Sequence, residues 1–158
     1  MPAKKASALQ PGEPAPDFEL LTDAGEPFRL SSMAGKKVVL YFYPRADTPG
    51  CTREACEFRD ALPRIEKKGT AVLGISPDKP ASLARFKQKY QLPFTLLSDP
   101  EHKVAEAYGV WKEKNMYGKK TMGIERTTFI LDEQGRIIRI FPKVKVDGHA
   151  AEVLEALS

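Results

Sequence analysis

Two cysteines, Cys51 and Cys56, are the only thiols of this chain, and they lie five residues apart. Two cysteines do not make a disulfide scaffold, and a chain of 158 residues can bury a core without one. In a reducing compartment, a close pair of this kind is more often catalytic or redox-sensing than structural. The pair is therefore the first candidate for chemistry in the sequence.

Cys51 is expected in the first turn of a helix that begins with Thr48 as N-cap, followed by a proline at the first helical position. Free backbone N–H groups and the positive end of the helix dipole favour an anion there, and the thiolate is the form of cysteine that attacks. Arg45 and Arg53 are local cations, and Gly50 lets the backbone come close to a substrate. The Thr48 hydroxyl could serve the cap or a bound oxygen. A buried structural cysteine is the alternative, but the polar and turn-forming neighbours favour a reactive one.

Cys56 suits a partner thiol only if the helix changes shape. Five residues of ideal α-helix place the two Cα atoms roughly 8–9 Å apart. A disulfide generally needs less than about 7 Å. The spacing thus predicts a helical reduced form and a locally unwound oxidised form. The alternative is that Cys56 is a small helix residue that faces the core.

The spacing also argues against related kinds of site. A dithiol oxidoreductase typically uses Cys-x-x-Cys, whereas four residues separate these cysteines. A zinc site needs more ligands, and the only histidines, His102 and His149, show no ligand spacing. No Cys-His hydrolase signature surrounds Cys51. We therefore expect no zinc site.

Alternating strands and helices must position this segment. Residues 38–43 form an apolar, β-branched and aromatic run that predicts a central strand, and the cysteine segment follows its carboxyl end, where open α/β sheets bind ligands. We expect an α/β fold with one domain over residues 1–158, a central mixed sheet flanked by helices, and an N-terminal β-hairpin. The other strands are expected at residues 17–21, 27–30, 70–76, 95–97, 127–131 and 136–141, and further helices at 80–90, 100–108 and 148–157. Pro63 predicts a kink or break in the helix that begins at Thr48, and residues 112–123 are expected to form a polar loop.

Composition limits the classes of partner. Hydrophobic residues make up 42% of the chain and charged residues 29%, a globular balance, and no apolar run approaches a membrane span. The formal net charge of +4 is spread along the chain and lacks the clustering with aromatics that is typical of nucleic-acid binding. No secretory signal follows the N-terminus. We expect a cytoplasmic protein without nucleic-acid or membrane partners.

The cysteine segment resembles a known family. Pro44-x-x-x-Thr48-x-x-Cys51 is similar to the peroxiredoxin active-site motif, and Thr-Pro-Gly-Cys-Thr-x-Glu-Ala-Cys over residues 48–56 resembles the Q-type, or bacterioferritin-comigratory, subfamily. Further segments lie where that family would place them: 15–18, 74–76 and 126–129. The resemblance implies a thioredoxin-like fold and a thiol peroxidase that reduces hydrogen peroxide or alkyl hydroperoxides and requires no metal or organic cofactor.

The resemblance also implies how the peroxide is bound and attacked. In the family, the cysteine that matches Cys51 attacks the peroxide and becomes a sulfenic acid. The residues that match Thr48 and Arg126 hold the peroxide oxygens, beside the position of Gly50. An arginine and fixed N–H donors lower the barrier because negative charge develops on the leaving oxygen. Without the motif, Arg126 would be an unremarkable charged residue that opens a strand.

Three further expectations follow from the family. The proline that matches Pro44 shields the site from water, and the glutamate that matches Glu54 orients the arginine, although Glu54 could simply complement the helix dipole. The cysteine that matches Cys56 resolves the sulfenic acid as an intramolecular disulfide, which thioredoxin or a similar dithiol then reduces. Because both thiols lie in one chain, we expect a monomer. Tyr43 and Trp111 could line the pocket mouth or pack in the core.

Two other functions remain open at this point. A general thiol–disulfide oxidoreductase on the same fold would reduce protein disulfides and react slowly with peroxide. A non-catalytic redox sensor or holdase would expose surface when the helix unwinds and would act through a partner. Thr48, Arg126 and the Pro/Gly flanks favour the peroxidase, since neither alternative needs all of them.

Overall fold

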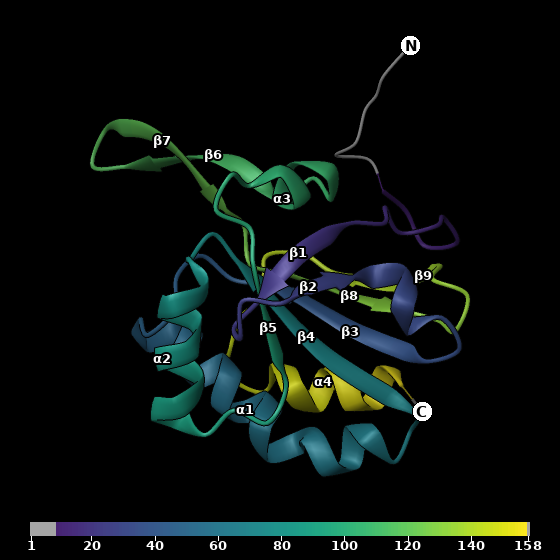
Figure 1. Cartoon of the computed structure of the whole chain (residues 1–158). Helices are drawn as coiled ribbons and strands as arrows, with labels where there is room; N and C mark the ends of the chain where they lie inside the picture. Colours follow the sequence, from purple (N-terminus) through teal and green to yellow (C-terminus); the bar gives the residue numbers. More distant parts are fainter. Residues whose placement is uncertain (1–8, 158) are drawn as a thin grey trace.

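A seven-stranded mixed sheet forms the centre of the computed structural model, which describes residues 9–157 (Figure 1). Its strand order is β2-β1-β5-β4-β3-β8-β9. The strands are β1 (Glu19–Thr22), β2 (Pro27–Arg29), β3 (Lys37–Phe42), β4 (Thr70–Ser76), β5 (Thr95–Ser98), β8 (Thr127–Leu131) and β9 (Ile137–Phe141). The helices are α1 (Pro49–Glu66), α2 (Pro80–Tyr90), α3 (Lys103–Ala107) and α4 (His149–Ala156), with a 3-10 turn η2 (Leu30–Met33).

The sheet mixes parallel and antiparallel pairs as expected. β3, β4 and β5 run parallel to one another, while β8, β9, β1 and β2 are added antiparallel at the two sides. The parallel strands are joined through α1 and α2, because a parallel pair needs a long crossover. β1 and β2 form the expected N-terminal hairpin. The predicted α/β class with a central mixed sheet is confirmed.

Two apolar layers hold the sheet. Alternate side chains of β3 point to opposite faces, so Val39 and Tyr41 pack with α1, α2 and α4, whereas Leu40 and Phe42 pack with α3. Figure 1 shows α1, α2 and α4 on one side of the sheet and α3 on the other. Because β3 is buried on both faces, its carboxyl end is fixed at the point where the cysteine segment begins.

The expectation of a polar loop over residues 112–123 is wrong. The segment forms a two-stranded antiparallel hairpin, β6 (Trp111–Met116) and β7 (Lys119–Ile124), outside the main sheet. Its turn residues Tyr117 and Gly118 both have positive φ, as a two-residue type I′ hairpin loop requires. The sequence hid this hairpin because its exposed strands have no apolar alternation that would predict a buried face.

Of the kink or break expected at Pro63, the break does not occur, since α1 continues to Glu66; the kink stays a prediction. Proline removes one N–H donor and frees one carbonyl in the preceding turn. Pro63 is exposed, so water can satisfy that carbonyl, while Leu62 and Ile65 on either side stay buried in the core. Packing of the apolar face therefore outweighs the local cost of the proline.

Gly74 is required by close packing between β3 and β4. A Cβ at this position would lie 2.9 Å from Cζ of the buried Tyr41, its register partner on β3. Gly74→Ala should therefore lower the free energy of unfolding by about 1–3 kcal/mol through overpacking. Urea denaturation tests this. The double variant with Tyr41→Leu should lose less than the sum of the two single variants, and strict additivity would contradict the steric explanation.

Candidate active site

The candidate site lies where β3 ends and α1 begins. A short loop over residues 44–48 leaves the sheet, and Thr48 occupies the N-cap position with Pro49 at the first helical position, as predicted. Cys51 is the third residue of α1 and is 1% exposed. Its side chain belongs to the apolar layer between α1 and the sheet, where Tyr43 and Ala55 also lie. The thiol is thus held in a fixed, largely dry position.

Arg126 connects the thiol to a buried carboxylate. Its Nη2 donates to Cys51 Sγ at 3.3 Å, and its Nη1 donates to Glu54 Oε1 at 2.6 Å. Cys51 and Glu54 are three residues apart on α1 and therefore share one helix face. The guanidinium of Arg126 thus places a positive charge beside the Cys51 sulfur, and the Glu54 carboxylate fixes the orientation of the guanidinium. The structure brings together Cys51, Arg126 and Glu54 as the sequence analysis expected.

Burial governs the electrostatics of this pair. Glu54 is 1% exposed, and burial raises its pKa to about 7 although Arg126 pulls it down. Burial opposes the charge of Arg126, but Glu54 and Cys51 outweigh burial and raise the pKa of the guanidinium. Glu54 Oε2 has no hydrogen-bond partner among residues 9–157. The carboxylate is therefore held in place by one strong contact, at an energetic cost to the fold.

Thr48 and Gly50 shape the approach to the sulfur. The Thr48 hydroxyl donates to the Arg45 carbonyl at 2.9 Å and makes no cap bond to the helix. Because its proton is used there, its lone pairs are left to accept a bond from a substrate O–H. A Cβ at Gly50 would lie 3.4 Å from Arg126 Nη2, which is an ordinary van der Waals contact. Gly50 therefore lies beside the guanidinium, and the guanidinium alone does not require glycine there.

Two aspartates that the sequence analysis did not single out hold the loop. Asp78 Oδ2 accepts the Ala46 N–H at 2.7 Å, and Asp47 accepts from Tyr90 Oη at 2.9 Å and Lys89 Nζ at 3.0 Å. Asp47 has a positive φ of 61°, a conformation that aspartate tolerates better than most residues. Asp78 could have been found because it follows the carboxyl end of β4, beside β3. Asp47 offered no such signal.

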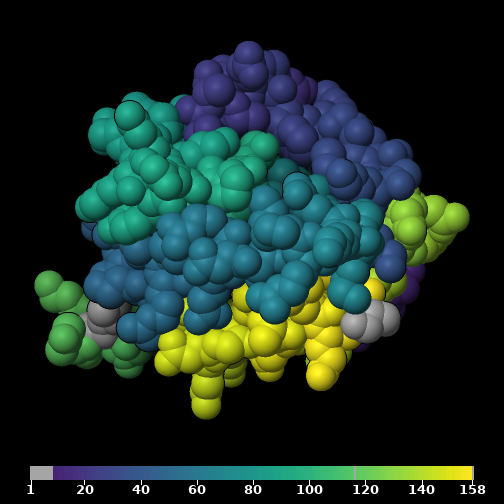
Figure 2. Space-filling model, turned by 90° about the horizontal axis from the view of Figure 1, so that it is seen from below, coloured from purple at the N-terminus to yellow at the C-terminus, as the bar shows by residue number. Residues whose placement is uncertain are grey.

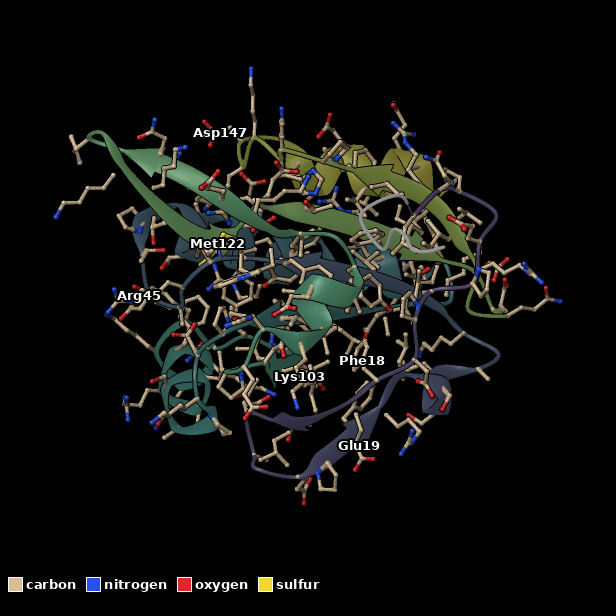
Figure 3. All side chains as sticks on the ribbon, turned by 90° about the horizontal axis from the view of Figure 1, so that it is seen from above. Phe18, Glu19, Arg45, Lys103, Met122 and Asp147 are labelled. Atoms are coloured by element: carbon tan, nitrogen blue, oxygen red, sulfur yellow. The ribbon has the colours of Figure 1, made fainter. Side chains whose placement is uncertain are left out.

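Other expected residues lie at varying distances from the chemistry. Cys56 is half-buried on α1 and is a free thiol, as Cys51 is, and the uninterrupted helix keeps the two apart. Arg53 pairs with Asp147 at 2.9 Å on the surface, and Arg45 is exposed at the rim of the molecule (Figure 3). The nearby cation that touches the sulfur is therefore Arg126, which is distant in sequence.

The remaining aromatic and imidazole groups are structural in their contacts. Tyr43 is buried in the core with Cys51, while Trp111 stacks on His102 with ring centroids 3.8 Å apart. His149 bonds Thr128 at 2.8 Å and Glu152 at 3.1 Å. A hollow of about 200 Å³ is lined by Val38 and Leu131, at the other end of β3 from the thiol. None of these groups forms a second catalytic cluster with Cys51.

Comparisons with known proteins agree with this geometry. The model of the AhpC/TSA family matches residues 11–140. The chain is 50% identical to peroxiredoxin Bcp of Bacillus subtilis over 149 residues, 94% of this chain and 95% of that protein. It is 46% identical to peroxiredoxin Bcp of Escherichia coli over 149 residues, 94% and 96% of the two chains. It is also similar to the bacterioferritin comigratory protein of Xanthomonas campestris, solved in work on its alkyl peroxide reduction activity, with a TM-score of 0.88, 41% identity, and coverage of 94% and 97%.

The raised pKa of Glu54 predicts a pH dependence of stability. In the unfolded chain this carboxyl ionises near its ordinary pKa of about 4.3, whereas in the folded protein it keeps its proton up to about pH 7. The folded state binds more protons between these values, so stability falls as pH rises across that window. Wild type should therefore lose up to about 3 kcal/mol more than Glu54→Gln between pH 4.5 and pH 8.

Urea denaturation at several pH values measures this difference. The matched control is Glu57→Gln, which removes a carboxylate from the same helix at a half-buried position. If wild type and Glu54→Gln had parallel pH profiles, Glu54 would ionise normally in the folded protein, and the assignment of a raised pKa would be wrong.

Proposed function

The chain belongs to the AhpC/TSA family and is a peroxiredoxin, and we propose that Cys51 is its peroxidatic cysteine and Cys56 its resolving cysteine. As a thiol peroxidase it uses a peroxide substrate and a thiol reductant. The observation that carries the assignment of Cys51 is the 3.3 Å contact from Arg126 Nη2 to its sulfur. A cation on a buried thiol stabilises the thiolate, which is the nucleophile.

The first step is attack by the thiolate on the peroxide. A hydroperoxide would donate its O–H to Thr48 Oγ1, while Arg126 and the free N–H groups of the first turn of α1 face its oxygens. The Cys51 sulfur forms a bond to one oxygen, the O–O bond breaks, and the other oxygen leaves with the electron pair. That oxygen takes a proton and departs as water or an alcohol. Cys51 becomes a sulfenic acid, and the developing charge on the leaving oxygen is stabilised by the guanidinium.

Glu54 and Pro44 support this step without touching the reacting atoms. The 2.6 Å contact of Glu54 fixes the guanidinium at one orientation, so Arg126 does not have to be ordered when the peroxide binds. Pro44 is half-buried at the end of β3 and limits the access of water to the loop. Burial of Cys51 suits a small substrate such as hydrogen peroxide or a narrow alkyl hydroperoxide.

The second step joins the two cysteines. The Cys56 thiolate attacks the sulfenic sulfur, an S–S bond forms as the S–O bond breaks, and the hydroxide takes a proton and leaves as water. Both residues lie on the continuous helix α1, whose geometry separates their Cα atoms by about 8–9 Å. The first turns of α1 must therefore unwind before the bond forms. A dithiol such as thioredoxin then reduces the disulfide and allows the helix to refold.

We also propose a monomer that works in the cytoplasm. Both cysteines belong to one helix, so a second chain is not needed for either step. Recycling through a dithiol needs a reducing compartment, since thiols are kept reduced there. None of the helices within residues 9–157 is long and apolar enough to cross a membrane.

Stopped-flow oxidation of the reduced protein by hydrogen peroxide separates this proposal from the two alternatives. A preorganised site predicts a second-order rate several orders of magnitude above that of free cysteine. A general thiol–disulfide oxidoreductase or a non-catalytic redox sensor would react like an ordinary thiolate. An ordinary rate would therefore exclude the peroxidatic role of Cys51.

Two serine variants should separate the oxidation of Cys51 from the resolution of its sulfenic acid by Cys56. Cys51→Ser should abolish peroxide turnover because it removes the nucleophile. Cys56→Ser should still consume about one equivalent of peroxide but should cycle poorly with thioredoxin, since its sulfenic acid has no internal partner. NADPH-coupled turnover and a peroxide-consumption burst measure the two effects. Full turnover by Cys51→Ser would exclude its role, and normal thioredoxin-driven turnover by Cys56→Ser would exclude internal resolution.

Oxidation should also change the backbone of α1. Amide exchange over residues 50–60 should become faster in the disulfide form than in the reduced form, because the first turns lose their hydrogen bonds. Residues 70–76 of the central strand β4 are the internal control and should stay protected in both forms. Equal protection of residues 50–60 before and after oxidation would contradict unwinding.

A further inference from the structure

The hairpin β6–β7 is separate from the main sheet and extends from the body of the molecule (Figure 1). Six cross-strand pairs, from Trp111–Ile124 at the base to Met116–Lys119 at the tip, define it. Ile124 is buried, whereas residues 119–122 on the same strand are exposed. The base is therefore anchored and the outer part contacts solvent.

The tip carries an aromatic residue that the fold does not use. Tyr117 is 100% exposed and has a φ of 56°, in the left-handed region. Glycine, asparagine and aspartate suit that position of a type I′ turn, whereas a bulky side chain is disfavoured there. Met122 on β7 is also exposed, at 47%. An exposed aromatic residue in an unfavourable conformation points to a role in binding, because Tyr and Met are enriched at protein interfaces.

The hairpin also concentrates positive charge. Residues 111–124 contain four lysines (112, 114, 119 and 120) against one glutamate, a formal charge of +3. At the base, Lys112 lies 4.0 Å from Glu125, so the unbalanced charge lies toward the tip. The two lysines at 119 and 120 are exposed near the tip. Charge that is gathered on one projecting element steers an oppositely charged partner. The chemistry of this surface therefore fits an acidic protein partner.

The hairpin is close in the sequence to a residue of the redox site. β7 ends at Ile124, two residues before Arg126, which contacts the Cys51 sulfur. At about 3.3 Å per residue, Lys120 lies at most about 20 Å from Arg126 along the strand. A standard interface of about 800 Å² per partner is roughly 30 Å across, so one partner can cover both. In Figure 3, Met122 lies on the same side of the molecule as Arg45 and Asp147, which flank the start of α1.

Figure 2, seen from below, shows part of the hairpin in green at the same edge of the molecule as the blue surface of the chain around the start of α1 and the yellow-green surface before α4. Figure 1 shows that the hairpin lies on the α3 side of the sheet, whereas α1 lies on the other side. Both cysteines lie on α1, so this helix must become accessible when the disulfide between Cys51 and Cys56 is reduced. A protein reductant whose interface extends along this edge would contact the hairpin as well.

We propose that the β6–β7 hairpin is the docking element for the protein dithiol reductant, with Tyr117, Lys119 and Lys120 contacting an acidic rim around the reductant's active-site cysteines. The inference rests on the proposed function, because it assigns a surface to the reductive half of that cycle. The reductant's thiolate attacks one sulfur of the Cys51–Cys56 disulfide, and its second thiol then completes the exchange. The hairpin lies outside the peroxide site and takes no part in the oxidation of Cys51.

Reductant kinetics test the proposal with a matched pair of variants. Lys119→Glu/Lys120→Glu changes the charge at the hairpin, and Lys36→Glu/Lys67→Glu makes the same change at exposed positions before β3 and after α1, at the other ends of those elements. The hairpin variant should lower kcat/KM for a thioredoxin with an acidic rim about tenfold at low salt, and less at high salt. The control variant should differ little from wild type.

Tyr117→Asn provides an independent variant. Asparagine suits the turn better than tyrosine, so the hairpin should keep its shape while the aromatic contact is lost. This variant should lower kcat/KM for thioredoxin with an unchanged salt dependence. With dithiothreitol, a small dithiol that needs no docking surface, all variants should turn over peroxide as wild type does.

The outcomes separate this inference from the function on which it rests. Failure of wild type to turn over peroxide with dithiothreitol would reject the proposed function. Equal effects of the hairpin and control variants on thioredoxin kinetics would reject the docking surface alone, as would an equal loss with dithiothreitol. Sedimentation of the reduced protein tests self-association, and a wild-type dimer that the hairpin variant loses would assign this surface to a second copy of the chain instead.

Discussion

The contact between one arginine and two residues of α1 is the interaction on which the site depends. Arg126 lies 75 residues after Cys51 in the sequence, yet it touches both the sulfur and Glu54. The register of the sheet makes this contact geometrically available. Thr127 pairs with Phe42, so the residue before β8 lies at the carboxyl end of β3, where the chain turns into α1. A slip of one residue would move every side chain of β8 to the opposite face and remove the guanidinium from the thiol.

The same helix must be folded for one step and unwound for the next. Its first turn lacks one common support, because Thr48 makes no side-chain cap bond. The buried carboxylate of Glu54, with one oxygen unpartnered within residues 9–157, adds a cost that unwinding relieves. The second half is anchored, since Phe58 and Ile65 are fully buried. Stability along α1 is therefore graded, with the weak end at the reactive cysteine and the strong end just beyond Cys56.

Much of the fold could be predicted because it depends on local patterns. The apolar runs that form β4 and β8 and the amphipathic segment that forms α2 were predicted with the bounds that the structure shows. Cys51 and Cys56 were predictable as a reactive pair from cap chemistry and the cysteine spacing, whereas the role of Glu54 followed from the family resemblance. The position of Arg126 followed from family resemblance, since no local pattern states which distant residue a strand register will bring to a thiol.

The failures have physical causes of their own. The hairpin β6–β7 buries only its base, so its sequence lacks the alternation that identifies a strand. Pro63 suggested a kink or a break because proline is costly inside a helix, but its exposed position allows the helix to continue through it while the neighbouring core contacts are kept. The hydrogen bonds of Asp47 to α2 depend on tertiary packing across 42 and 43 residues, which spacing in the sequence does not encode.

Arg126 and the helix α1, which carries the cysteines, are held in different ways, and this difference explains why one stays in place while the other can move. The backbone of Arg126 is fixed on both sides, because Glu125 N–H donates to the Val110 carbonyl at 2.8 Å and Val144 N–H donates to the Arg126 carbonyl at 2.9 Å. These bonds tie the arginine to the base of the hairpin and to the segment before α4. Electrostatic stabilisation works best from a group that does not reorganise. The arginine is thus the stationary half of the site and the cysteine helix the movable half, so unwinding of α1 can open the thiol without dismantling the charge to which it returns.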